Sequence, residues 1–172
     1  MKRTIAMAAA AAALAACQST PDEPPRATAA LQPTKGSKAF GEATFEQAGD
    51  KVRVIVFAQG LRPDREHGFH IHEAGDCSSG DGMSTKGHFN PYGKPHGQPT
   101  SAERHAGDLP ALKAGKDGRA KIDVTLDVIS IGRGPGNIAG RGLIIHADPD
   151  DYKTQPTGNA GARIACGVIK AG

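Results

Sequence analysis

The chain has 172 residues, which is enough for one domain of ordinary size after about 35 N-terminal residues are set aside. It contains 23 Gly, 12 Pro and no Trp, and its apolar segments are short, which favours an all-β domain over a helical one. The formal net charge is +3 and the basic residues are scattered without interleaved aromatics, which argues against a nucleic-acid partner.

Residues 1–16 predict a signal peptide of the lipoprotein type. Lys2 and Arg3 precede an apolar stretch that is too short to remain in a bilayer as a spanning helix. The segment Leu14-Ala15-Ala16-Cys17 resembles the lipobox of bacterial lipoproteins, in which the cysteine becomes the lipidated first residue. We therefore expect Cys17 to anchor the protein in the bacterial cell envelope, facing the periplasm, and Gln18 and Ser19 after it resemble outer-membrane sorting. The alternative is cleavage by the ordinary signal peptidase, which would leave a soluble protein.

Residues 17–34 are expected to form the lipidated N-terminus and a disordered tether. Their Pro, Ala, Thr and Ser composition cannot bury enough apolar surface to order the segment. The folded domain is then expected to cover residues 35–172.

Short β-branched or alternating runs within that domain predict strands. Residues 39–47 and 51–59 flank Ala48-Gly49-Asp50 and predict a hairpin. Further strands are expected at residues 68–73, 119–127, 142–146 and 163–169. Residues 74–108 and 147–161 are long, polar and rich in Gly and Pro, and loops of that length are usually functional or disordered.

All seven histidines lie between residues 67 and 146, which suggests a metal site. His70 and His72 are two positions apart in an expected strand, so both imidazoles project from the same face and can share one ion. Exposed strands also carry such pairs by accident.

The first long loop supplies three imidazoles and one carboxylate, a set that suits tetrahedral zinc: His88, His96, His105 and Asp108. A polar loop with solvated histidines is the alternative. A second set consists of four imidazoles and suits tetragonal copper: His70, His72, His88 and His146. The two sets together require His88 to serve both ions, which spacing alone does not establish.

Three cysteines in an exported protein require an explanation. With Cys17 assigned to the lipobox, Cys77 and Cys166 remain as a natural disulfide pair in an oxidising compartment. Two buried free thiols are the alternative.

Several motifs resemble the copper-zinc superoxide dismutase family, in the family's order, across about residues 35–172. They are His67-Gly68-Phe69-His70-Ile71-His72-Glu73, Gly87-His88-Phe89-Asn90-Pro91, Arg104-His105-Ala106-Gly107-Asp108-Leu109 and the C-terminal stretch from Gly158 to Ile169. The resemblance implies a flattened eight-stranded Greek-key β-barrel, an immunoglobulin-like sandwich in overall type, with two long loops packed over one side. It also implies the copper and zinc sets given above.

The resemblance implies roles for further residues. Asp150 matches an aspartate that hydrogen-bonds a copper histidine and a zinc histidine, and His67 matches a structural histidine that is not a ligand. The implied disulfide joins Cys77 to Cys166 and holds Arg163 near copper, where Arg163 would attract the superoxide anion. Pro156 stands where animal members carry a steering lysine, and whether Lys153 replaces that lysine is open.

The implied activity is dismutation of superoxide to oxygen and hydrogen peroxide, with Arg163 and His88 as the residues that act on the substrate. Superoxide and a membrane, through the lipid, are the expected partners, and a homodimer is possible. The alternatives are an envelope protein that binds copper and zinc without turnover, and a purely structural β-sandwich, which leaves the ligand set unexplained.

Overall fold

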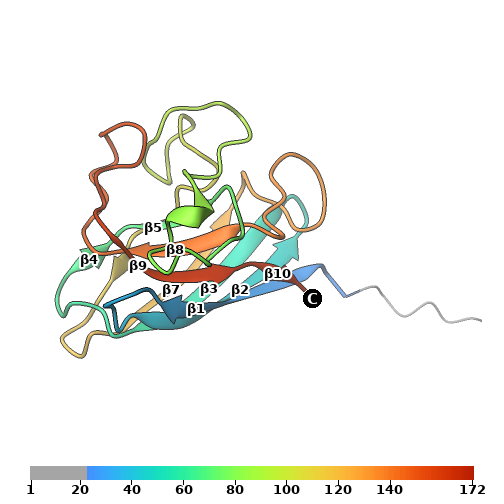
Figure 1. The fold of residues 1–172 in the computed structure, drawn as a ribbon. Coiled ribbons are helices and arrows are strands. Elements are labelled where there is room, and N and C mark those ends of the chain that lie inside the picture. The colour runs from blue at the N-terminus through green and yellow to red at the C-terminus, as the bar shows by residue number, and fades with distance from the viewer. Residues whose placement is uncertain (1–22) are drawn as a thin grey trace, which may run out of the picture.

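The computed structural model describes residues 23–172, and it is an all-β structure built on one curled antiparallel sheet (Figure 1). The expected signal peptide and Cys17 lie outside these residues. Eight strands form the sheet: β1 (Arg26–Pro33), β2 (Phe40–Ala48), β3 (Lys51–Gln59), β5 (Phe69–His72), β7 (Ala120–Leu126), β8 (Gly142–His146), β9 (Arg163–Val168) and β10 (Lys170–Ala171). A smaller sheet pairs β4 (Glu66–His67) with β6 (Leu112–Lys113), and one 3-10 turn, η1, covers Met83–Thr85. The expected eight-stranded architecture is confirmed.

The strand order is that of a Greek key. The large sheet runs β5-β8-β9-β1-β2-β3-β7, with β10 paired to β1 beside this path. The meander β1-β2-β3 occupies one half, and the chain then crosses to β5 at the opposite edge before β7 returns beside β3. The small β4–β6 sheet connects the two edge strands of the large sheet, β5 and β7. Only Gly68 separates β4 from β5, and a short turn joins β6 to β7. The sheet is thus a curled, open barrel.

The core fills the inside of this curl with alternating apolar residues. β3 buries every second residue, namely Val52, Val54, Val56 and Ala58, as the period of a strand requires. Phe45 of β2 is completely buried against them. Each large side chain buried in this way contributes about 1.5–3 kcal/mol. The β2–β3 hairpin pairs in continuous register from Phe40↔Gln59 to Ala48↔Lys51, and Gly49 in its turn adopts a φ of 62°.

The expectation of a disordered tether up to residue 34 is wrong for residues 26–33. These form β1, which buries Ala27, Ala29 and Leu31 and pairs with β2 over most of its length. At its end β1 changes partner, and Gln32 pairs with Cys166 of β9. Side chains of β1 alternate between buried and exposed up to Leu31, and β2, β9 and β10 pair with the strand and supply the hydrogen bonds that stabilise it.

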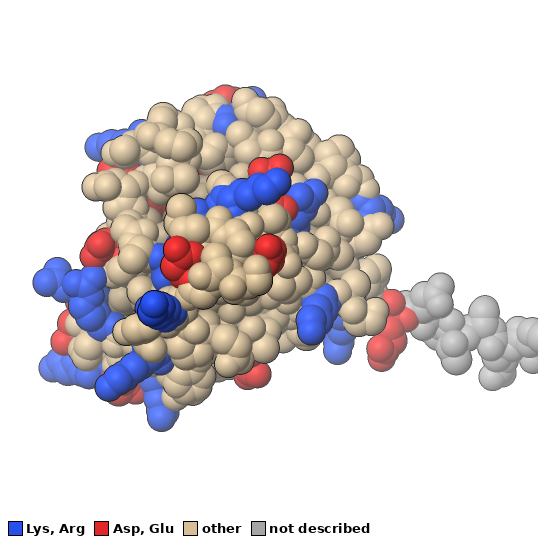
Figure 2. Space-filling model, in the orientation of Figure 1, with Lys and Arg blue, Asp and Glu red and all other residues tan. Residues whose placement is uncertain are grey.

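The two long loops lie on the same side of the sheet and contact each other (Figure 1). Within residues 23–172, no helix is long and apolar enough to cross a membrane. Figure 2 shows that Lys and Arg side chains are interspersed with Asp and Glu over one face of the molecule. Such a surface is a mixed one, without a large field of one sign.

Candidate metal centre

Two clusters of buried side chains with metal-binding atoms lie next to each other and share one histidine. Within each cluster, the four candidate ligand atoms all lie within 4.8 Å of one another. The first cluster, here called the copper-type cluster, is His70, His72, His88 and His146. The second, the zinc-type cluster, is His88, His96, His105 and Asp108. The structure therefore brings together both sets that the sequence predicted, including the sharing of His88.

Paired strands and one loop position the copper-type cluster. His70 and His72 lie two positions apart on β5, so they share one face of the strand. β5 pairs antiparallel with β8, and His146 is the last residue of β8. A register irregularity between Ile145 and His146 marks the point where β8 leaves the regular ladder. His88 comes from the long loop and forms an isolated β-bridge with His72.

Backbone carbonyls select which nitrogen of His72 and His146 faces the cluster. Nδ1 of His72 donates to the Lys86 carbonyl at 2.8 Å, and Nδ1 of His146 donates to the Gly161 carbonyl at 3.2 Å. The two Nε2 atoms are left facing each other at 3.4 Å. Burial, the largest cause, holds the pKa of both imidazoles well below the ordinary value, so both present uncharged lone pairs.

The zinc-type cluster is arranged around one carboxylate oxygen. Oδ1 of Asp108 lies 2.9 Å from Nδ1 of His88, 3.0 Å from Nδ1 of His96 and 3.4 Å from Nδ1 of His105. Oδ2 of Asp108 accepts hydrogen bonds from the backbone N–H groups of Gly97 and His105. Burial alone would raise the pKa of Asp108, but hydrogen bonds from the three histidines outweigh burial and hold the pKa well below its usual range.

His88 presents one ring nitrogen to each cluster. Its Nδ1 faces Asp108, while its Nε2 is buried without a hydrogen-bond partner in the described part of the chain. Burial, as the largest cause, lowers the pKa of His88 to about 4. The neutral ring carries a lone pair on one nitrogen and a proton on the other, so it must lose that remaining proton before it can bind a metal on the side of each cluster.

Asp150 connects the two clusters by hydrogen bonds to one histidine of each. Its Oδ2 lies 2.7 Å from Nε2 of His70, and its Oδ1 lies 2.9 Å from Nε2 of His96. His70 consequently turns Nδ1 toward the copper-type cluster, and this atom is buried without a partner among the described residues. Burial lowers the pKa of His96, but hydrogen bonds that His96 donates to Asp108 and Asp150 outweigh burial and raise it to about 9. The role that the resemblance implied for Asp150 agrees with this geometry.

The second long loop holds Asp150 and His96 in place through backbone contacts. Gln155 makes two hydrogen bonds to the backbone of His96, each of 2.9 Å. Gly158 adopts a φ of 67° and passes so close to the Asp150 carboxylate and His96 that a Cβ atom there would collide with both. A larger residue at position 158 would therefore displace this contact.

The residues present fit the two expected metals. Four imidazoles suit copper, while three imidazoles and a carboxylate suit zinc. His70 Nδ1 and His88 Nε2 are buried and have no hydrogen-bond partner among residues 23–172, and they are the atoms that a metal would satisfy.

Comparison with known proteins agrees with this donor set. The sequence model of the copper/zinc superoxide dismutase (SODC) family matches residues 39–169. The chain belongs to this superoxide dismutase family. A Cu-Zn superoxide dismutase of Aquifex aeolicus (strain VF5), numbered 2, is 42% identical over 149 residues, covering 84% of this chain and 86% of the relative. A Cu-Zn superoxide dismutase of Paramecium bursaria Chlorella virus 1 is 44% identical over 154 residues, covering 86% and 79%.

A solved structure extends the comparison to the fold. The crystal structure of the clock protein EA4 superposes on this superoxide dismutase with a TM-score of 0.78 and 42% sequence identity. The superposition covers 89% of this chain and 98% of the EA4 chain.

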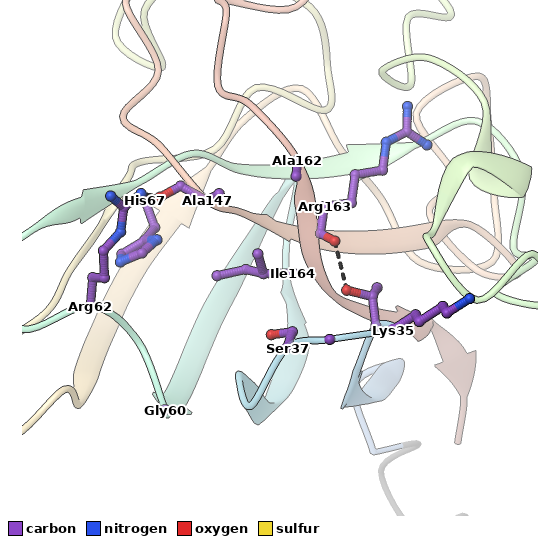
Figure 3. A pocket seen from close by; sticks show the side chains of 11 residues that line it. Lys35, Ser37, Gly60, Arg62, His67, Ala147, Ala162, Arg163 and Ile164 are labelled. Carbon is purple, nitrogen blue, oxygen red and sulfur yellow. Dashed lines mark hydrogen bonds between the residues drawn. The ribbon is translucent and has the colours of Figure 1, made fainter.

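Arg163, at the start of β9, is directed toward the disulfide-bonded loop of the dismutase. Its guanidinium donates to the Gly82 carbonyl at 2.7 Å, to Thr85 Oγ1 at 2.8 Å and to the Lys86 carbonyl at 2.6 Å. Figure 3 shows this side chain pointing away from a cavity of about 380 Å³ at the end of the sheet, while the Arg163 carbonyl accepts a hydrogen bond from Thr34. Burial, the largest cause, lowers the pKa of Arg163 from its ordinary value, which is high enough that the side chain stays charged.

The predicted disulfide between Cys77 and Cys166 is present, with the two Cα atoms 5.9 Å apart. It ties the loop that binds Arg163 to the strand that carries Arg163. His67 stays outside both metal clusters, as expected, and its Nδ1 donates to the His146 carbonyl at 2.8 Å.

Sequence reasoning missed Lys86 and Gln155. Lys86 acts through its own backbone carbonyl, and the Gln155 side chain bonds the backbone of His96. Lys86 has a φ of 64° and a ψ of −147°, a region that a residue other than glycine occupies at a cost of about 1–3 kcal/mol. Its carbonyl receives hydrogen bonds from both His72 and Arg163. A carbonyl acceptor is common to all residue types, so the sequence carried no signal for this role.

Proposed function

We propose that the protein dismutates superoxide to oxygen and hydrogen peroxide at the joined clusters. The observation that carries the proposal is that His88 belongs to both clusters, one a four-imidazole set and the other a set of three imidazoles and a carboxylate. Copper, when bound by His70, His72, His88 and His146, supplies the one-electron chemistry that oxidises one superoxide and reduces the next.

The protein's own groups manage protons and orientation. His88 Nε2 is the ring nitrogen that does not face Asp108, so whenever it is not bound to a metal it is suited to hold a proton and to deliver it to the reduced substrate. Asp150 holds His70 and His96 in the ring orientation that leaves each Nδ1 for a metal. Zinc in the second cluster would keep His88 oriented and the long loop ordered.

The positive charge of Arg163 attracts the superoxide anion. The Arg163 guanidinium and His72 Nδ1 donate to the same Lys86 carbonyl, at 2.6 Å and 2.8 Å, which places the guanidinium beside the copper-type cluster. Its charge also contributes to the lowered pKa of His72 and His146. A fixed cation there stabilises the approaching superoxide anion. Three hydrogen bonds to the disulfide-bonded loop limit how far the guanidinium can move.

The test is superoxide dismutation by the purified protein loaded with copper and zinc. His146→Ala should lose turnover while keeping zinc, because His146 belongs only to the copper-type cluster. Lys116→Ala, on the exposed turn before β7, is the matched control and should keep full activity. A wild-type protein that holds both metals without turnover would point instead to a non-catalytic copper- and zinc-binding protein.

We also propose that Cys17 is lipidated and anchors the protein to the bacterial envelope, in the outer membrane and facing the periplasm. The support is the order of Lys2-Arg3, an apolar stretch and Leu14-Ala15-Ala16-Cys17. The natural protein should partition into the detergent phase, and Cys17→Ser should move it to the aqueous phase. An unmodified N-terminus on the exported protein would contradict the proposal. A homodimer stays a prediction that sedimentation of the purified protein would test.

A further inference from the structure

The Arg163 guanidinium has three acceptors in the disulfide-bonded loop, and only one of them is a side chain. Nη2 donates to the Lys86 carbonyl at 2.6 Å, and Nη1 donates to the Gly82 carbonyl at 2.7 Å. The third acceptor is the hydroxyl oxygen of Thr85, 2.8 Å from Nη1. Every residue type carries a backbone carbonyl, so only the third hydrogen bond depends on which residue stands at its position.

Packing and a second hydrogen bond fix the direction of the Thr85 hydroxyl. The Thr85 side chain is completely buried. Its hydroxyl donates to the Gly82 carbonyl at 2.8 Å, which leaves the oxygen lone pairs for the arginine, a group that can only donate. Its methyl group lies against Gly142 of β8, where an added Cβ atom would stand 2.8 Å from it. Because a β-branched side chain is stiff at χ1, the hydroxyl oxygen stays directed at Arg163.

The aliphatic part of Arg163 is held by the same loop. A Cβ atom added to Gly82 would lie 3.2 Å from Cβ and 3.3 Å from Cδ of Arg163, and Gly82 has a φ of 77°. The loop backbone therefore packs directly on the arginine. With its stem packed there, the guanidinium is oriented by the acceptors around its terminal nitrogens.

The hydrogen bonds of Arg163 decide which of its five N–H groups stay open to an anion. Nη1 uses both of its N–H groups, one on the Gly82 carbonyl and one on Thr85. Nη2 uses one on the Lys86 carbonyl. The Nε–H group and the second N–H group of Nη2 have no partner among residues 23–172. Thr85 thus completes the attachment of Nη1 and leaves two donors for a ligand.

We propose that Thr85 is a positioning residue, which holds the Arg163 guanidinium beside the copper-type cluster with two N–H groups left for the substrate anion. The inference rests on the proposed function. Thr85 is uncharged, so it adds nothing to attraction at long range and acts only on the contact between Arg163 and the anion. A hydrogen bond of ordinary net strength corresponds to a roughly two- to tenfold change in an equilibrium constant.

The experiment measures the dissociation constant of azide, a small anion, by optical titration of the full protein loaded with copper and zinc. Thr85→Val removes the hydroxyl and keeps the buried shape, while Thr85→Ser keeps the hydroxyl. Ser84→Ala is the matched control, because the Ser84 hydroxyl donates to the Asp76 carbonyl within the same loop and not to Arg163. Thr85→Val should raise the dissociation constant roughly two- to tenfold with an unchanged copper spectrum, and the other two variants should match wild type.

A double-mutant cycle separates positioning of Arg163 from general loosening of the loop. In an Arg163→Ala background, Thr85→Val should leave the azide dissociation constant unchanged, because Thr85 acts only through Arg163. An equal effect of Thr85→Val with and without Arg163 would overturn the proposal. A rise of similar size in Ser84→Ala, or wild-type affinity in Thr85→Val, would also overturn it.

Dismutation rates give a second test. Thr85→Val keeps the charge of Arg163, so its second-order rate should fall by the same factor at low and high ionic strength. A loss that appears only at low salt would contradict positioning, because it would be an effect on long-range attraction.

The mobility of Arg163 provides a readout that depends neither on turnover nor on copper. In the metal-free protein, the NMR order parameter of the Arg163 Nε–H group should be lower in Thr85→Val than in wild type and unchanged in Ser84→Ala. An unchanged order parameter in Thr85→Val would contradict the proposal. If the wild-type protein fails to dismutate superoxide, the proposed function fails, and the order parameter still decides whether Thr85 positions Arg163.

Discussion

Removal of the disulfide between Cys77 and Cys166 should lower the free energy of unfolding of the metal-free protein by about 4–5 kcal/mol. The bond joins residues 89 positions apart. For a loop of that length, the lost entropy of the unfolded chain corresponds to about 4.6 kcal/mol at 25 °C. The folded loop keeps other contacts, since Lys35 N–H donates to the Gly80 carbonyl and Arg163 still binds the loop. The effect should therefore come mainly from the unfolded state.

The assay is guanidinium unfolding followed by circular dichroism, with the metal-free double variant Cys77→Ser, Cys166→Ser compared with oxidised wild type. The slope of stability against denaturant should increase in the variant, because its unfolded chain is less compact. Wild type kept reduced should behave like the double variant, which controls for the serine side chains. A difference below about 1 kcal/mol with an unchanged slope would refute the reasoning, because it would show that the bond does not constrain the unfolded chain.

Three further predictions concern the contacts behind the metal centre. Asp150→Asn should weaken metal binding by about 10- to 100-fold in chelator competition, because an amide cannot accept from both histidines, while Asp148→Asn should leave binding unchanged. Gly158→Ala should lower the melting temperature and the zinc content, because its Cβ collides with Asp150 and its φ is positive; full zinc content would contradict this. In the metal-free protein, the pKa of His96 is raised from 6.5 to about 9, so its contribution to stability is complete below pH 6.5 and is lost as the pH rises to about 9. Denaturant titrations should show this decline, and His96→Asn should remove it.

Local patterns were sufficient to predict most strands. Alternating β-branched residues marked residues 51–59, and a Gly-containing turn joined them to residues 40–48, so the β2–β3 hairpin matched the prediction closely. The sequence did not predict β1, because Ala27 and Ala29 carry little hydrophobic signal and proline-rich neighbours make the segment resemble a tether. Its partners, β2 and β9, decide that it is a strand, and β9 is far away in sequence.

The sequence by itself determined which side chains form the metal centre, because the clustered histidines supply suitable donors and the motifs, in the order of the family they resemble, identify the two sets. Only the tertiary structure decided which nitrogen of each ring faces which cluster, since that depends on carbonyls and carboxylates brought in from distant segments. The Lys86 carbonyl orients His72, and Asp150 orients His70 and His96. Such contacts depend on where folded backbones meet, and residue type alone does not encode that geometry.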